Sequence, residues 1–271
     1  MTILQAGSSR SWAAVGESQR AMRFHPPIAR ACVLIAACGF LLICVGCGYY
    51  HYAGPLAPAS QQRADMQVND EGVVLFERGD LLIQMRAVTD RELNQQFASD
   101  SEAGPESTNP YTFGDTRFWD GVAERARFTV FHLRVANEGF PKVKVDPARV
   151  VMETPGGRQY WSLSLQQLDS YYRAYAIGFR GSEYARYQER LDILRRTLFR
   201  NEEVFDGQTA EGYLVFPALH HDVKQVSVQV LDVVLRFDHR SEPQETAELT
   251  YRFRRETGRL FGDGRLVLET D

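Results

Sequence analysis

Alternating apolar and polar positions begin at Val73 and recur to about Phe253. The pattern opens with VVLFE, turns at Arg78-Gly79-Asp80 and resumes with LLIQMRAV. This predicts a β-hairpin, because short runs bounded by Gly and Asp are typical of paired strands. Further strands are expected at residues 128–137, 143–152, 157–161, 213–216, 226–237 and 247–253. Roughly eight strands without strand–helix–strand alternation favour an antiparallel β-sandwich.

Two stretches interrupt this strand pattern. Residues 97–121 are polar, contain Pro and Gly, and then carry aromatic side chains. Residues 163–200 repeat apolar side chains every three or four positions, as a helix does. We expect one helix at about 165–177 and a second that begins after Ser182, a residue type favoured at a helix N-cap. The sequence therefore predicts a mainly β domain over residues 67–254, with a loop insertion and a helical insertion, and a C-terminal tail at 255–271.

The start of the chain has a different composition. A basic stretch ends at Arg30 and is followed by the uncharged apolar run Ala31–Gly48, which is the order of parts in a secretory signal. Its roughly sixteen apolar residues are few for a membrane-spanning helix, although an uncleaved anchor helix is the alternative. All four cysteines of the chain lie in this run, so residues after Cys47 form no disulfide with one another.

The end of the apolar run, Val45-Gly46-Cys47, resembles the lipobox of bacterial lipoproteins, in which a small residue precedes the cysteine that signal peptidase II exposes. The resemblance implies that residues 1–47 are a signal segment and that Cys47 becomes the lipidated first residue. It implies a domain outside the cytoplasm that is anchored to the lipid bilayer. Ile35-Ala36-Ala37-Cys38 resembles the same motif, so Cys38 is the alternative lipidation site.

Two features refine this interpretation of the leader. A start at Met22 gives a conventional short basic leader, so Met22 is an alternative first residue. Gly48 follows the lipidated cysteine and carries no aspartate-type retention signal. In a bacterium with two membranes, the resemblance therefore implies the periplasmic face of the outer membrane. Residues 48–66 contain three tyrosines, then prolines and polar residues without apolar periodicity, and we expect a flexible tether there.

Within the predicted β domain, three segments occur in a recognisable order: HLRVANEG, then PGGRQY, then FDGQTAEGYLVF after the helical insertion. This order is similar to the telokin-like, immunoglobulin-like domains of uncharacterised bacterial lipoproteins. Their Gly-x-x-x-x-Gly-x-Leu-x-Phe segment corresponds to Gly207, Gly212, Leu214 and Phe216. The resemblance covers about residues 68–254 and implies an immunoglobulin-like sandwich of the cell envelope. It implies no particular activity.

Charge and motifs argue against several classes of function. The formal net charge is −4 and the longest basic runs are pairs such as Arg195-Arg196, so we expect no nucleic-acid partner. His220-His221-Asp222 is a cluster of metal-competent residues, but adjacent side chains of an extended chain point to different sides, and we expect a surface turn without metal. The sequence has no G-x-S-x-G elbow and no phosphate-binding glycine loop. We therefore assign no catalytic residue and no cofactor, and we keep a metal-dependent hydrolase as a third hypothesis.

Tyrosine and arginine are concentrated in the helical insertion. Because both residue types are enriched in the cores of protein interfaces, our leading hypothesis is a non-catalytic interaction module that binds an envelope protein. The candidate interaction surface consists of Tyr171, Tyr172, Tyr175, Tyr184 and Tyr187, together with Trp119 from the loop insertion. The same rings would also serve to pack the insertion onto the sandwich. The alternative is a binder of a small ligand or glycan, with Trp119, Trp161 and Tyr160 as stacking platforms.

Overall fold

The structure, a computed structural model, describes residues 48–116, 125–178 and 183–270. Several positions discussed above lie outside these residues: the signal segment 1–47 with Met22, Cys38 and Cys47, and also Trp119 and Ser182. None of the helices in the described part of the chain is long and apolar enough to cross a membrane.

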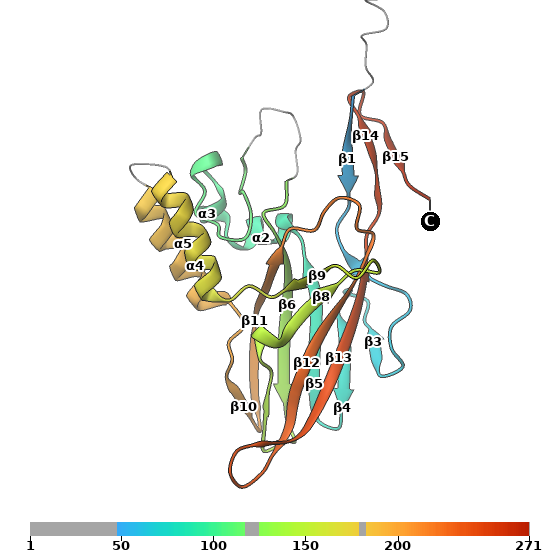
Figure 1. Cartoon of the computed structure of the whole chain (residues 1–271), viewed down its shortest axis with the longest axis vertical. Coiled ribbons are helices and arrows are strands. Elements are labelled where there is room, and N and C mark those ends of the chain that lie inside the picture. The colour runs from blue at the N-terminus through green and yellow to red at the C-terminus, as the bar shows by residue number, and fades with distance from the viewer. Residues whose placement is uncertain (1–47, 117–124, 179–182, 271) are drawn as a thin grey trace, which may run out of the picture. The chain divides into compact units, whose positions relative to one another are not determined.

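Two antiparallel sheets form the centre of the domain (Figure 1). The first has the order β11 (Gln208–Pro217), β6 (Phe128–Asn137), β5 (Leu81–Val88), β4 (Val74–Arg78) and β3 (Met66–Val68). The second has the order β10 (Glu203–Phe205), β7 (Lys142–Lys144), β12 (Gln225–Phe237), β13 (Pro243–Arg254) and β2 (Ala57–Pro58). In the second sheet, β12 also pairs with β8 (Val150–Glu153), which pairs with β9 (Gln159–Trp161). The predicted mainly β, antiparallel architecture is confirmed.

The main hydrophobic core joins the facing sides of these two sheets. Ile83 and Leu133 from the first sheet and Val228 and Tyr251 from the second are fully buried in one cluster. Along β5 the buried residues alternate with partly exposed ones, as expected when only one side of a strand faces a core. The registers are consistent with this pattern, since Met85 lies opposite Leu133 and both are buried. The hydrophobic alternation seen in the sequence thus becomes the inner face of each sheet.

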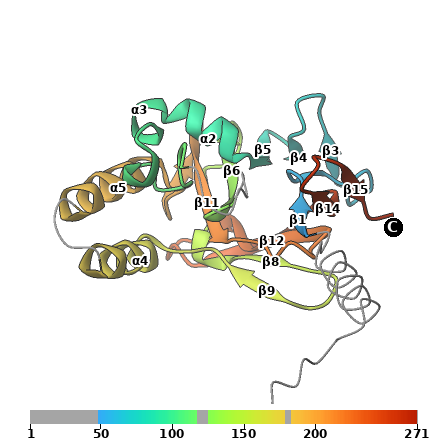
Figure 2. The same ribbon diagram turned by 90° about the horizontal axis from the view of Figure 1, so that it is seen from above.

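Helices cover one end of the outer face of the first sheet. The two predicted helices are confirmed as α4 (Leu165–Gly178) and α5 (Glu183–Thr197), which lie side by side in Figures 1 and 2. A capping box marks the start of α4. Ser164 Oγ accepts from Gln167 N at 3.3 Å, and Gln167 Oε1 accepts from Ser164 N at 2.8 Å. Leu168 and Leu194 are fully buried in a second core with Val215 of β11.

The loop insertion contains more regular structure than the sequence indicated. It is preceded by α2 (Asp90–Gln96) and contains α3 (Ala98–Ser101) and the short 3-10 helix η1 (Gly104–Glu106). A second 3-10 helix, η2 (Pro147–Arg149), leads into β8. Leu93 of α2 is fully buried in the same core as α4 and α5. The α2–α3 segment and the helical insertion therefore form one layer on the sheet.

The expected tether at 48–66 and tail at 255–271 are corrected by the structure. Residues 49–53 form β1 (Tyr49–Ala53), which pairs with β14 (Thr257–Phe261), and β14 pairs in turn with β15 (Leu266–Leu268). We call these three strands the stem sheet; they lie at the upper end of Figure 1 beside the C-terminus. The physical reason is that a strand needs a partner, and the partner of β1 lies at the opposite end of the sequence, where local periodicity cannot indicate it.

Candidate functional site

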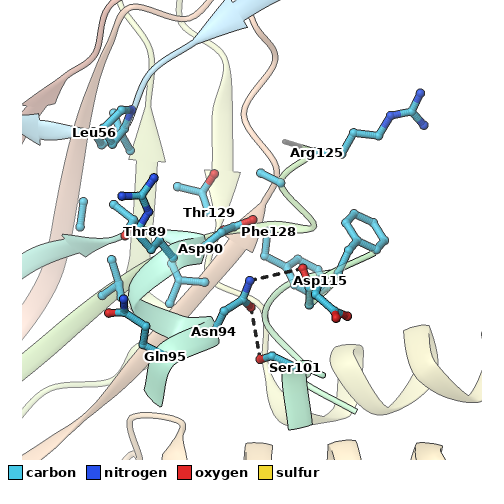
Figure 3. Close-up of a pocket in the computed structure, with 18 of the residues that line it drawn as sticks. Leu56, Thr89, Asp90, Asn94, Gln95, Ser101, Asp115, Arg125, Phe128 and Thr129 are labelled. Atoms are coloured by element: carbon cyan, nitrogen blue, oxygen red, sulfur yellow. Dashed lines mark hydrogen bonds between the residues drawn. The ribbon is translucent and has the colours of Figure 1, made fainter. Parts of the chain in front are cut away.

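A cleft of about 890 Å³ lies between α2, the start of β6 and the chain segment that joins β1 to β2 (Figure 3). Its apolar lining includes Leu56, Val88 and Phe128. Its polar lining comes mainly from α2, α3 and the 113–116 loop. The polar and charged residues are Thr89, Asp90, Arg91, Asn94, Gln95, Ser101, Glu102, Asp115, Thr116, Arg125, Thr129 and Arg255. Cations and carboxylates are mixed, so the lining favours a ligand with both polar and apolar parts over a strongly charged one.

One wall of the cleft is held by a network of buried and half-buried amides and hydroxyls. The Asn94 side chain donates to Gly114 O at 3.3 Å and accepts from Ser101 Oγ at 3.3 Å, the two contacts drawn in Figure 3. Behind it, the fully buried Asn109 donates to Ser101 Oγ at 2.9 Å and to Asn94 Oδ1 at 3.2 Å. Gly114 has a φ of +60°, and a Cβ there would lie 2.4 Å from Ser101 O. The wall is therefore fixed in one arrangement before any ligand enters.

Arg255 also lines the cleft, and its guanidinium group is already engaged. Its Nε donates to Val223 O at 2.8 Å and its Nη2 donates to His220 O at 2.6 Å. Burial lowers the pKa of Arg255 from its ordinary value, although the pKa is so high that the side chain stays cationic at neutral pH. Because two of its donors serve backbone carbonyl groups, Arg255 mainly joins the 220–223 loop to the stem sheet.

The predicted tyrosine surface divides into buried and exposed members. Tyr172 and Tyr187 are only 1% and 4% exposed, so they are corrected from interaction residues to packing residues. Tyr172 accepts from Arg127 Nη1 at 3.0 Å and donates to Pro110 O, while Tyr187 donates to Asp169. Burial raises the pKa of the Tyr172 hydroxyl. These rings face the sheet because they continue the apolar stripes of their helices.

The remaining tyrosines of the insertion are accessible. Tyr184 is 67% exposed, Tyr171 44% and Tyr175 37%. Ile177, which the sequence interpretation missed, is 76% exposed on the same helix as Tyr171. The Tyr171 ring meets the ring of Phe128 edge-on, with 5.4 Å between centroids, and Phe128 lines the cleft. The exposed aromatic surface of the helices and the cleft are thus connected through one ring contact.

Of the three proposed stacking residues, Trp119 lies outside the described residues, and the two described ones, Tyr160 and Trp161, are not brought together. Trp161 is 46% exposed on β9, whereas the neighbouring Tyr160 packs against the main core. Successive residues of a strand point to opposite faces, so these two rings cannot form one platform. Neither of them lines the cleft. Of these two described residues, only Trp161 offers an exposed ring.

A histidine cluster forms around the turn that the sequence singled out. The ring of His221 stacks on that of His51 in β1 at 3.7 Å between centroids, and His220 Nδ1 lies 2.9 Å from Asp222 Oδ1. Arg158 donates to both carboxylate oxygens of Asp222, and this contact lowers the Asp222 pKa. Partial burial lowers the pKa of His221, and the nearby His51 and His220 lower it further. Within the described residues, no three His, Cys, Asp or Glu side chains are arranged to hold a metal ion.

We expect His132 of β6 to make a pH-dependent contribution to stability. Burial lowers the pKa of His132 in the folded protein; the charge of Glu211 opposes this shift, and the charges of Arg86 and Arg134 add to it. The unfolded chain therefore takes up the proton first as the pH falls below about 6.5, and the folded state loses stability there; above that pH both states are neutral and the contribution vanishes. We expect His132→Gln to flatten the loss of unfolding free energy between neutral and mildly acidic pH, measured by urea denaturation. His239→Gln, at an exposed turn between β12 and β13, is the matched control and should leave the slope unchanged.

Comparison of the chain with models of protein families, with curated proteins and with solved structures found no match. The described chain is defined by two antiparallel sheets with one shared core, a helical layer on one of them and a three-stranded stem sheet. Its candidate site combines the cleft beside α2 with the exposed aromatic side chains of α4 and α5.

Proposed function

We propose that this protein is a bacterial lipoprotein of the cell envelope that binds a protein partner without catalysing a reaction. It is anchored through a lipid on Cys47, or on Cys38 as the alternative, and its domain lies outside the cytoplasm. The proposal for the anchor is supported by the order of basic stretch, apolar run and lipobox-like cysteine at the start of the chain. The proposal for the domain is an immunoglobulin-like sandwich, supported by two antiparallel sheets that share one core.

The exposed aromatic side chains of the helical insertion carry the proposal of a protein partner. Tyr171, Tyr184 and Ile177 expose large apolar area on two packed helices, whereas other rings of the same helices are buried. Tyrosine is a preferred anchor in interfaces, because a rigid ring supplies contact area at little cost in conformational entropy. The folded helices hold these anchors in place before binding, which reduces the entropy lost when a partner is bound.

In-cell photo-crosslinking tests this proposal. A benzophenone amino acid at Ile177 should give one discrete protein adduct when cells expressing the full chain are irradiated. Tyr171→Ala with Tyr184→Ala should abolish the adduct, since truncation of an anchor residue costs about 2 kcal/mol, roughly thirtyfold in Kd. Arg195 is exposed on α5, the helix that carries Tyr184, and Arg195→Ala should leave the adduct unchanged. An adduct that persists in the double tyrosine variant would contradict the proposed surface.

The cleft supports a second candidate function, the binding of a small ligand. Its volume of about 890 Å³ is sufficient for a small organic molecule, and its wall is preformed by the Asn94–Asn109 network. The two candidates are distinguished by a second crosslinking position at Gln95, which lines the cleft. A cleft that takes a small ligand yields no protein adduct at Gln95, whereas a partner that enters the cleft gives the same adduct at Gln95 and Ile177.

A further inference from the structure

The two faces of the stem sheet differ in composition. Residues directly opposite each other in paired strands share a face, and so do residues two apart along one strand. Tyr52 lies opposite Gly258, which lies opposite Leu268, and Tyr50 lies opposite Leu260, which lies opposite Leu266. One face therefore consists wholly of apolar and aromatic residues and glycine. We call it the apolar stem face; it comprises Tyr50, Tyr52, Gly258, Leu260, Leu266 and Leu268.

The leucines of this face are accessible. Leu260, Leu266 and Leu268 are 37%, 41% and 43% exposed, and they lie close together on two adjacent strands. The opposite face is different, because His51 there stacks on His221 and Arg259 lies 4.7 Å from the centre of the Tyr49 ring. Contiguous exposed leucines on a sheet mark a surface that meets an apolar partner. The opposite face is mixed, since it carries His51, Thr257 and Arg259 beside Tyr49, Phe261 and Val267, whereas the apolar stem face carries no charged residue.

The position of this face in the chain indicates its partner. The described chain begins at Gly48, the last residue of the uncharged run 31–48 that contains Cys47, and the stem sheet begins at Tyr49. An extended chain spans at most about 3.6 Å per residue, so Tyr50 lies within roughly 11 Å of Cys47. A lipid on Cys47 would thus hold the stem sheet at the headgroup layer, where tyrosine is favoured and burial of leucine side chains is favourable.

We propose that the apolar stem face lies against the lipid surface of the membrane and fixes the orientation of the domain above it. This inference rests on the proposed lipidation of Cys47. The charged groups of the stem are mixed, since Arg265 lies 3.8 Å from Asp263 and Glu269 accepts from Thr257. Contact through apolar area, and not through charge, predicts that the face meets zwitterionic lipid and that high salt leaves the contact in place.

Photo-crosslinking along β15 tests the inference. The full chain, with its leader, is made in a bacterial host with a benzophenone amino acid at Leu266, Val267 or Leu268, and irradiated membranes are analysed by mass spectrometry. Val267 is the matched control, because it is 45% exposed on the same strand but points to the opposite face. We expect phospholipid adducts at positions 266 and 268 at least several-fold more often than at position 267, with no change in high salt.

Each other outcome overturns the inference. Equal lipid adducts at all three positions would mean that no face of the sheet is preferred. A protein adduct of fixed mass at 266 or 268 would mean that the face binds a partner protein or a second copy of the chain. If position 266 gives no adduct while Cys47 carries its lipid, the inference fails and the proposed function stands. If the chain carries no lipid and is absent from the membrane fraction, both the inference and the proposed function fail.

Discussion

Replacement of Arg190 by alanine is expected to lower the free energy of unfolding by about 3–5 kcal/mol. The Arg190 side chain is 1% exposed, and its Nη1 lies 3.5 Å from Glu183 Oε2 in the same helix. Its Nη2 donates to Ser107 O at 2.7 Å, which ties α5 to the loop insertion. The variant would leave the buried Glu183 carboxylate with less compensation and Ser107 O without its donor. Urea denaturation of the purified protein measures the loss.

Two further variants distinguish this buried pair from ordinary helix charges. Arg195→Ala removes an arginine of the same helix that is ion-paired with Asp192 at 2.8 Å but about half exposed, and its cost should stay within about 0.5 kcal/mol. Arg190→Met combined with Glu183→Met should recover much of the stability, because no uncompensated buried charge then remains. A loss below about 1 kcal/mol for Arg190→Ala would contradict the role of the pair.

The parts of the fold that follow from local periodicity were predictable. The hairpin of β4 and β5 has a turn with Gly79 at φ +58°, and its alternation places every second residue in the core. The stripe of Tyr187, Leu191 and Leu194 gave α5 close to its observed bounds. These elements are specified by residues within a few positions of one another, so a single sequence suffices to find them.

Other elements depend on contacts that local patterns do not contain. The seven-residue α2 was missed, although Thr89 and Glu92 form a capping box that the sequence displays as Thr-x-x-Glu. The sequence predicts a tether and a tail where the stem sheet lies, because the pairing of β1 with β14 joins opposite ends of the chain and leaves no local signal. The stacking of His51 on His221 also joins residues far apart in the sequence, so no local pattern indicates it. Long-range pairing, not propensity, decided these regions.

The division of the tyrosines shows how far helical spacing determines a candidate site. Tyr172 lies four residues after Leu168, so both fall on the buried stripe of α4. Tyr171 is one position away and lies on the flank, where it is partly exposed. Spacing therefore separates packing rings from accessible rings once the buried side of the helix is known. It does not reveal the cleft, whose lining comes from segments between residues 53 and 255.

In the proposed function, Cys47 carries the lipid that anchors this domain in the cell envelope. Membrane fractionation and intact-mass analysis of the wild-type chain, Cys47→Ser and Cys38→Ser in a bacterial host test it most directly. We expect the wild type and Cys38→Ser in the membrane fraction, each starting at a Cys47 that carries a diacylglyceryl group, and Cys47→Ser without lipid. An unmodified chain that starts at Met1 or Met22 and stays in the membrane in all three cases would contradict the account.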